Sequence, residues 1–66
     1  MNKIREYREL YGLSQEELAR RLGIDRSSVA KWESGCNKPT LNHLLELSKI
    51  FRCTIDDLIG LNERRD

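Results

Sequence analysis

Residues 14–34 read SQEELARRLGIDRSSVAKWES, and this stretch decides the fold. It opens with a capping box, in which the Ser14 hydroxyl and the Glu17 carboxylate each satisfy a backbone N–H group of the other residue at a helix start. Gly23 can take the left-handed conformation that ends a helix, and Asp25 is placed to cap the next helix. The sequence therefore predicts two short helices joined by a very short turn.

The second of these helices carries an apolar and a polar face. Val29 and Trp32 stand three residues apart and are expected to pack into the core, while Ile24 fills the angle between the helices. Trp32 is interpreted as a packing residue rather than a base-stacking one. The outward residues are small or polar: Arg26, Ser27, Ala30, Lys31 and Ser34. A short turn with Gly between two such helices is typical of a helix-turn-helix.

One further helix is expected on each side of this stretch. Before it, apolar spacings of three and four predict a helix at about residues 3–11, with Ile4, Tyr7 and Tyr11 along one stripe. After it, Pro39 precedes a longer helix. The core stripe expected for that helix is Leu41, Leu44, Leu45, Ser48 and Phe51.

The C-terminal part predicts a fifth, short helix. Thr54 with Asp57 is expected to cap it, and it runs through Ile59. Alternating β-branched runs, which are typical of strands, do not occur in the sequence. We therefore predict an all-α fold, a compact five-helix bundle in one domain at residues 1–61, followed by a short charged tail at residues 62–66.

The length of 66 residues restricts the chemistry that the chain can carry. So small a domain cannot bury a full apolar core and also enclose a cavity of about 300 Å³ or more. His43 has no catalytic partner in the sequence and is expected to be a solvated surface group, so we predict that the chain is not an enzyme. Cys36 and Cys53 lack the spacing of a disulfide scaffold or a zinc site. They are expected to be reduced thiols, and no cofactor is predicted.

The net charge of +1 conceals an uneven distribution along the chain. Residues 20–38 carry five basic and two acidic side chains, a balance of +3, whereas residues 1–19 and 39–66 each sum to −1. A basic middle third suits a surface that faces phosphates, although it also fits a merely solvated basic face. No run of adjacent apolar residues exceeds two, so neither a membrane span nor a signal-peptide core is predicted.

Taken in order, the motifs resemble those of one known family. On their basis the chain is similar to the DNA-binding domains of the phage repressor and Cro type of helix-turn-helix protein, across about residues 4–60. The resemblance implies a five-helix domain that binds operator DNA as a dimer, with the third helix, about residues 25–34, in the major groove. The segments that carry it are LSQEELA at 13–19, LGI at 22–24, VAKWESG at 29–35 and PT at 39–40.

The resemblance also implies roles for individual residues. Arg26, Ser27 and Lys31 match the positions that read base edges, although Arg26 or Lys31 can instead hold a phosphate. Gln15 matches a glutamine that donates to a phosphate at the start of its helix. Ser28 either touches DNA or turns inward beside the core. The full set expected at phosphates is Gln15, Ser28, Ser34, Asn37, Lys38 and Thr40.

Three charged residues are interpreted separately. In this family an arginine of the first helix often pairs with the glutamate that ends the third, and Arg8 and Glu33 occupy the matching places. The resemblance thus implies a partly buried ion pair with a structural role. Asp25 stands where the family commonly has Ser or Thr. It is expected to cap its own helix, or to accept from a cytosine amine.

The last helix is the expected dimer surface. Leu58 is assigned to the core, whereas Ile59, Leu61 and Ile55 exceed what so short a helix can bury within its own domain. They are expected to form a homodimer interface. The open alternative is a satellite cluster that covers the fourth helix.

The function favoured by the sequence is sequence-specific regulation of transcription. We expect a cytoplasmic, nucleoid-associated repressor that binds a pseudo-palindromic operator of double-stranded DNA as a homodimer, with no membrane and no small-molecule ligand as a partner. An antitoxin-like interaction module is the alternative. Such a module would bind a toxin and regulate its own synthesis through DNA binding.

Overall fold

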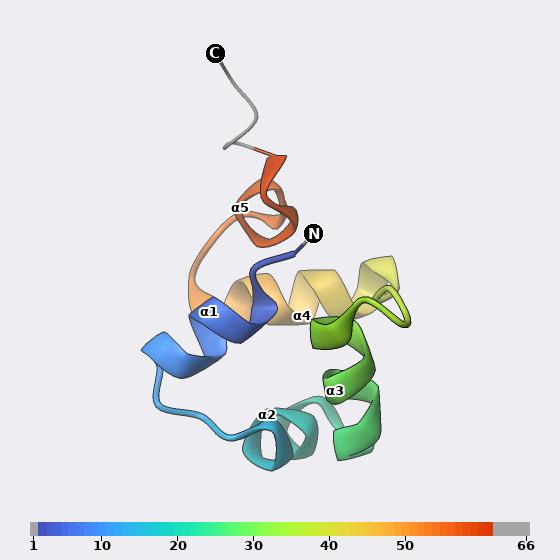
Figure 1. Cartoon of the computed structure of the whole chain (residues 1–66). Coiled ribbons are helices and arrows are strands. Elements are labelled where there is room, and N and C mark those ends of the chain that lie inside the picture. The colour runs from blue at the N-terminus through green and yellow to red at the C-terminus, as the bar shows by residue number, and fades with distance from the viewer. Residues whose placement is uncertain (1, 62–66) are drawn as a thin grey trace.

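The computed structural model describes residues 2–61, and every regular element in that range is a helix (Figure 1). The predicted all-α fold of five helices is therefore confirmed. The predicted charged tail at residues 62–66 lies outside the described residues. The helices are α1 (Ile4–Leu10), α2 (Gln15–Leu22), α3 (Arg26–Ser34), α4 (Leu41–Phe51) and α5 (Ile55–Ile59).

Local capping explains where most of these helices begin and end. The Ser14 hydroxyl accepts from the backbone N–H of Glu17, whose carboxylate accepts from the N–H of Ser14, so the predicted capping box of α2 is present. Gly23 ends α2 with φ 72°, a left-handed conformation that side chains with a Cβ disfavour. Thr54 and Asp57 form the same reciprocal box at α5.

The expected side-chain cap at Asp25 is wrong. Asp25 occupies the N-cap position of α3 with an extended backbone, but its carboxylate accepts no hydrogen bond from the first turn. Its backbone carbonyl instead accepts from the N–H of Ser28 at 3.0 Å. The residue type favoured a cap and Asp25 does hold the N-cap position, but this exposed residue makes no side-chain cap bond.

The core combines residues from all five helices. Val29, Trp32 and Leu58 are buried as predicted, and Ile24 packs against this core from the turn between α2 and α3. Residues with little or no exposed surface are Ile4, Leu18, Ala19, Val29, Trp32, Leu47, Phe51 and Leu58.

The predicted core stripe of α4 is partly wrong. Leu41 is 65% exposed and Leu45 is 44% exposed, whereas Leu47 is fully buried. The face that meets the core is centred on Leu47, and it includes Phe51 and the half-buried Leu44 at spacings of four and three. Since leucines surround most of this helix, several apolar stripes were compatible with the sequence, and packing against the other helices selected one.

Helix α1 closes the bundle through aromatic contacts. The Tyr7 ring stacks on the Phe51 ring with centroids 5.6 Å apart, and the Tyr11 hydroxyl donates to the Phe51 carbonyl over 2.9 Å. Tyr11 caps the C-terminus of α1 and stays 44% exposed, so it contributes less to the core than the expected stripe implied. The backbone N–H of Lys3 donates to the carbonyl of Leu58, which joins the start of α1 to α5.

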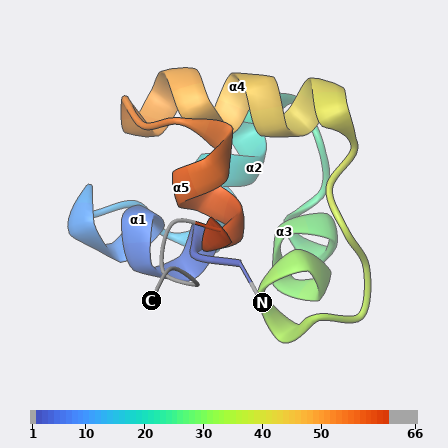
Figure 2. The same ribbon diagram turned by 90° about the horizontal axis from the view of Figure 1, so that it is seen from above.

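The arrangement leaves α2 and α3 together at one end of the molecule (Figure 1). α2 packs mainly on α3, α4 contacts α5, and α1 contacts both α3 and α4. Viewed from above, α4 runs along one edge, while α1 and α3 lie on opposite sides of α5 (Figure 2). One face of α3 is thereby left open to solvent.

Several features of the described part of the chain concern other kinds of site. None of its helices has the length and apolarity needed to cross a bilayer. Between residues 2 and 61 no group of three or more His, Cys, Asp and Glu side chains is placed to bind a metal ion. Cys36 is an exposed free thiol and Cys53 a half-buried one, whose pKa is raised by burial and by the nearby Asp57.

Candidate nucleic-acid interface

Helix α3 presents a polar, solvent-exposed face. Arg26, Ser27, Lys31 and Ser34 are exposed, whereas Val29 and Trp32 on the opposite side are buried. Ser28 is half-buried, which fits the intermediate position expected for it. These four exposed side chains all belong to α3, the helix that packs on α2.

A buried ion pair holds α3 to α1. Arg8 Nε lies 2.6 Å from Glu33 Oε2, and Arg8 Nη2 lies 3.1 Å from Glu33 Oε1, which makes the pair bidentate. The two side chains are only 11% and 5% exposed, respectively. Arg8 Nη1 also donates to the Leu13 carbonyl over 2.8 Å. The hydrogen bonds to Glu33 raise the pKa of Arg8.

Gln15 extends this pair into a network that reaches the outward face of α3. Its amide Nε2 donates to Glu33 Oε1 over 2.9 Å, and its Oε1 accepts from Arg26 Nη1 over 3.2 Å. Three helices are thus joined, from Arg8 on α1 through Gln15 on α2 to Arg26 on α3. Because an amide nitrogen carries two hydrogens, Gln15 Nε2 keeps one donor that no residue from 2 to 61 uses.

Sequence reasoning missed the contacts of Gln15 with Glu33 and Arg26. Glu33 and Arg26 are 18 and 11 positions from Gln15 in the sequence. Both lie on α3, whereas Gln15 lies on α2, so no helical periodicity relates them. The one signal in the sequence for these contacts was the expected ion pair between Arg8 and Glu33. A buried carboxylate has more acceptor sites than one guanidinium uses, which predicts a further polar neighbour.

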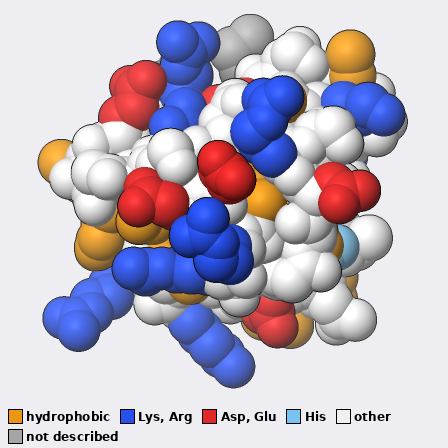
Figure 3. All heavy atoms as spheres, turned by 90° about the horizontal axis from the view of Figure 1, so that it is seen from below, with side chains coloured by type: hydrophobic (Ala, Val, Ile, Leu, Met, Phe, Trp, Pro, Cys, Tyr) orange, Lys and Arg blue, Asp and Glu red, His pale blue; other side chains and the backbone are white. Residues whose placement is uncertain are grey.

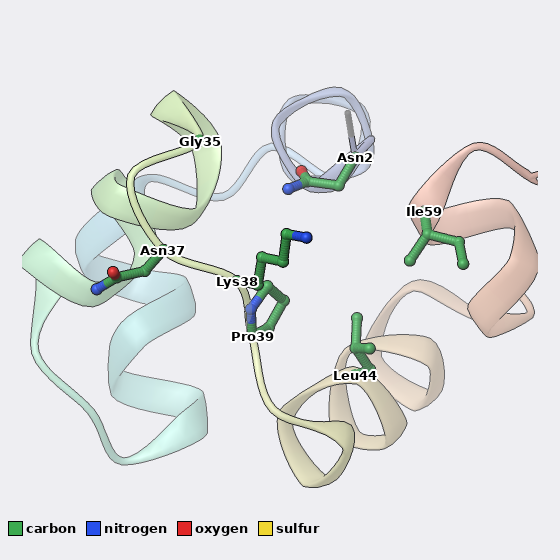
Figure 4. Close-up of a pocket in the computed structure, with 7 residues that line it drawn as sticks. All are labelled: Asn2, Gly35, Asn37, Lys38, Pro39, Leu44 and Ile59. Carbon is green, nitrogen blue, oxygen red and sulfur yellow. The ribbon is translucent and has the colours of Figure 1, made fainter.

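Three residues expected at phosphates lie at the end of α3 or in the loop that follows it: Ser34, Asn37 and Lys38. The Ser34 hydroxyl donates to the Lys31 carbonyl over 3.2 Å, and the N–H of Asn37 donates to the same carbonyl, also over 3.2 Å. The Asn37 and Lys38 side chains leave the loop on opposite sides, and Lys38 extends toward Asn2 (Figure 4). Lys38 therefore points away from Asn37, which is also expected at a phosphate.

The expectation that His43 is a solvated group is wrong. Its ring is half-buried and lies against the Trp32 ring with centroids 5.1 Å apart. His43 Nδ1 lies 3.0 Å from Thr40 Oγ1, which also accepts from the backbone N–H of His43. Thr40 thus caps α4, as predicted for a helix start.

Charges of both signs cover the end of the molecule formed by α2 and α3. The view from below shows Lys and Arg side chains interspersed with acidic ones (Figure 3). Part of the positive charge is compensated locally, since Arg20 lies 3.8 Å from Glu16 on α2. The exposed Arg26 and Lys31 on α3 lie in no ion pair among the described residues.

A helix-turn-helix family model matches residues 4–58, which include all of α1–α4 and most of α5. The chain belongs to the XRE-type helix-turn-helix family. This family consists of DNA-binding regulators of transcription, so the resemblance inferred from the motifs is confirmed.

Three relatives place the chain within this helix-turn-helix family. It is 39% identical over 61 residues to the HTH-type transcriptional activator BcrR of Enterococcus faecalis, covering 92% of this chain and 30% of BcrR. It is 38% identical over 56 residues to an HTH-type transcriptional regulator of Archaeoglobus fulgidus, covering 85% of this chain and 80% of the relative. It is 37% identical over 62 residues to the HTH-type transcriptional regulator YgzD of Bacillus subtilis, covering 94% of both chains.

The helix-turn-helix domain also presents apolar side chains on α5 and directly after it. Ile59 is 40% exposed and Leu61 is 48% exposed, while Ile55 is half-buried and Leu58 fully buried. Ile59 and Leu61 thus keep exposed apolar surface that a partner can reach. Ile55 is less available than the sequence suggested.

Proposed function

We propose that the chain is a repressor that binds a pseudo-palindromic operator in double-stranded DNA as a homodimer, with α3 in the major groove. The observation that carries the proposal is the exposed polar face of α3, which the buried Arg8–Glu33 pair and Gln15 fix on the scaffold. A recognition helix must be held rigidly, because displacements of about 1 Å disturb hydrogen-bonding geometry with base edges.

The polar face of α3 supports a division of roles. Arg26, Ser27 and Lys31 would contact base edges, with Arg26 or Lys31 suited to the O6 and N7 acceptors of guanine. Gln15, Ser28, Ser34, Asn37 and Thr40 would lie along the phosphates on either side of the groove. Lys38 reaches a phosphate only if its side chain turns from the direction seen in Figure 4.

Gln15 would couple backbone recognition to base recognition. Its one remaining amide hydrogen points to a phosphate role, and its oxygen already accepts from Arg26. A phosphate bound by Gln15 would thus hold the Arg26 guanidinium in a defined position at the start of α3. Such a link favours one register of the protein on the duplex.

A second copy would provide the rest of the specificity. One helix contacts only a few base pairs, and two copies related by two-fold symmetry contact two half-sites. The apolar side chains of Ile59 and Leu61, supported by Ile55, are the proposed contact surface. The dimer would repress by occupying DNA that the transcription machinery needs, in the cytoplasm at the nucleoid.

Selection of bound sequences from a random duplex library tests this proposal. The expected result is an enriched sequence with two inverted half-sites about 10 base pairs apart, centre to centre. A variant with Arg26→Ala and Lys31→Ala should lose the enrichment, while Lys49→Ala, which removes an exposed positive charge on α4, serves as the control. Recovery of sequences without any shared pattern would contradict sequence-specific binding, and a single enriched half-site would contradict the dimer.

A further inference from the structure

A surface groove separates the end of α3 from α5 and has a volume of about 460 Å³ (Figure 4). One wall is the loop after α3, with Lys38 and Pro39, and the other is Ile59 on α5. Leu44 on α4 and Asn2 before α1 complete the lining. The sequence had suggested that no enclosed cavity of about 300 Å³ would form, and this larger hollow lies at the surface, outside the core.

Hydrogen bonds join the N-terminal segment, Asn2 and Lys3, to α3 on one side of the groove and to α5 on the other. Asn2 Nδ2 donates to the Trp32 carbonyl at the end of α3 over 3.1 Å, and Asn2 Oδ1 accepts from the N–H of Ile4. Lys3 is joined to Leu58 on α5 through its backbone N–H. The segment therefore bridges the two walls, and the groove exists before any ligand arrives.

The lining combines three apolar side chains with one charge. Pro39, Leu44 and Ile59 supply an apolar surface, and the Lys38 side chain extends over it toward Asn2 (Figure 4). Lys38 forms no ion pair or side-chain hydrogen bond with any residue from 2 to 61. No acidic residue lines the groove in the described part of the chain. An anion is thus attracted and a cation is repelled.

We propose that this groove binds a small organic carboxylate with an apolar body. The carboxylate would pair with the Lys38 ammonium and accept from the second amide hydrogen of Asn2, because the first is donated to Trp32. The apolar body would lie against Pro39, Leu44 and Ile59. The volume fits the usual range for small-molecule sites of about 300–1,000 Å³. This site is separate from the proposed DNA-binding face of α3, but it shares Ile59 with the proposed dimer surface, so the carboxylate and a second copy would compete for that side chain.

Octanoate is the probe for the test, with 1-octanol and acetate as controls that lack the charge and the apolar body. Titration of the whole chain, followed by amide chemical shifts without DNA, should give saturable shifts confined to residues around the groove. The expected dissociation constant for octanoate is on the order of 1 mM. Acetate should produce no saturable shifts, and 1-octanol should bind about tenfold more weakly than octanoate.

Two variants make the test specific. Lys38→Gln should weaken octanoate binding about tenfold and leave 1-octanol binding unchanged, whereas Lys49→Gln, which removes an exposed lysine outside the lining, should alter neither. Ile59→Ser should weaken both octanoate and 1-octanol without unfolding the domain, because Ile59 is 40% exposed.

Three results would overturn the proposal. The first is the absence of saturable shifts, and the second is octanoate binding by Lys38→Gln that equals binding by the parent chain. The third is groove shifts that depend on protein concentration alone, which would mean that a second copy occupies the groove. Since no DNA is present, a failure here leaves the proposed operator binding untouched. Failure to enrich an operator would likewise leave this site standing.

Discussion

The Gln15 side chain donates to Glu33 Oε1 over 2.9 Å, at the same oxygen that accepts from Arg8 Nη2 over 3.1 Å. One carboxylate, 5% exposed, thus receives donors from two other helices. A buried carboxylate without donors would be costly, so these contacts satisfy its oxygens and fix α1, α2 and α3 relative to one another.

Replacement of Glu33 should destabilise the domain strongly. Glu33→Gln keeps the shape of the side chain but leaves the Arg8 guanidinium, 11% exposed, without a counter-charge. We expect the free energy of unfolding to fall by about 3 kcal/mol in urea titrations. Glu16→Gln is the control, because its ion pair with Arg20 is exposed, and it should cost less than about 1 kcal/mol. Equal losses in both variants would contradict the structural role of the buried pair.

The capping box of α2 should make part of the stability depend on pH. The hydrogen bonds of Glu17 with the backbone and hydroxyl of Ser14 lower the pKa of Glu17 from its ordinary value of 4.5. The unfolded chain then binds the proton more readily than the folded chain. The contribution is complete above pH 4.5 and is lost as the pH falls through the lower folded value.

Glu17→Gln tests this dependence, because glutamine accepts from Ser14 without titrating. Urea titrations between pH 6 and pH 3 should show a smaller loss of stability for the variant than for the parent chain over this interval. The two proteins share every other carboxylate, so the difference isolates Glu17. Parallel pH profiles would show that the box contributes no linkage.

The sequence allowed capping residues to be predicted where residues close in the chain determine the geometry of a helix start. Ser14 with Glu17 and Thr54 with Asp57 are reciprocal pairs three residues apart, and both formed. The two faces of α3 also followed from spacing, because Val29 and Trp32 are its only large apolar residues. Local chemistry thus determined the elements and the face that α3 exposes.

Long-range packing decided what the sequence could not predict. The buried face of α4 depends on which side α1 and α5 cover, and this selected Leu47 over Leu41. The partners of Gln15 and the ring contact of His43 with Trp32 join residues on different elements. The direction of the Lys38 side chain depends on the conformation of the loop after α3, and this loop has no sequence periodicity from which its conformation could be predicted.

The missing cap at Asp25 has a measurable consequence. Ser14→Ala removes an acceptor that the Glu17 N–H uses and should lower stability by about 1 kcal/mol. Asp25→Ala removes no such bond and should lower stability by less than about 0.5 kcal/mol. Thermal and urea unfolding of both variants provides the comparison. A cost at Asp25 equal to that at Ser14 would show that its carboxylate caps α3 in solution.

The proposed dimer surface can be tested by charge insertion. Ile59→Glu places a carboxylate among apolar side chains of a second copy and should convert a dimer to a monomer in sedimentation equilibrium. Leu41→Glu is the matched control, since Leu41 is 65% exposed on α4 and outside the proposed surface. It should leave the molecular mass unchanged. An unaltered mass for Ile59→Glu would remove α5 from the interface.

The hydrogen bond between Gln15 and Arg26 predicts coupled effects on DNA binding. Arg26→Ala should weaken binding to the selected operator by about 1–3 kcal/mol and relax the preference at one base pair. Gln15→Ala should weaken all sequences alike, because its proposed partner on the DNA is a phosphate. If Gln15 also holds the guanidinium through the 3.2 Å bond, the double variant should lose about 0.5–1 kcal/mol less than the sum of the single losses.

Fluorescence anisotropy with a labelled operator measures this coupling. Gln15→Ala combined with Lys31→Ala is the control, because no hydrogen bond joins those two side chains among the described residues, and their losses should add within about 0.5 kcal/mol. Strict additivity for Gln15 and Arg26 would mean that their bond breaks when DNA binds. Coupling confined to the operator, and absent on unrelated duplexes, would place the Gln15–Arg26 link in base recognition itself.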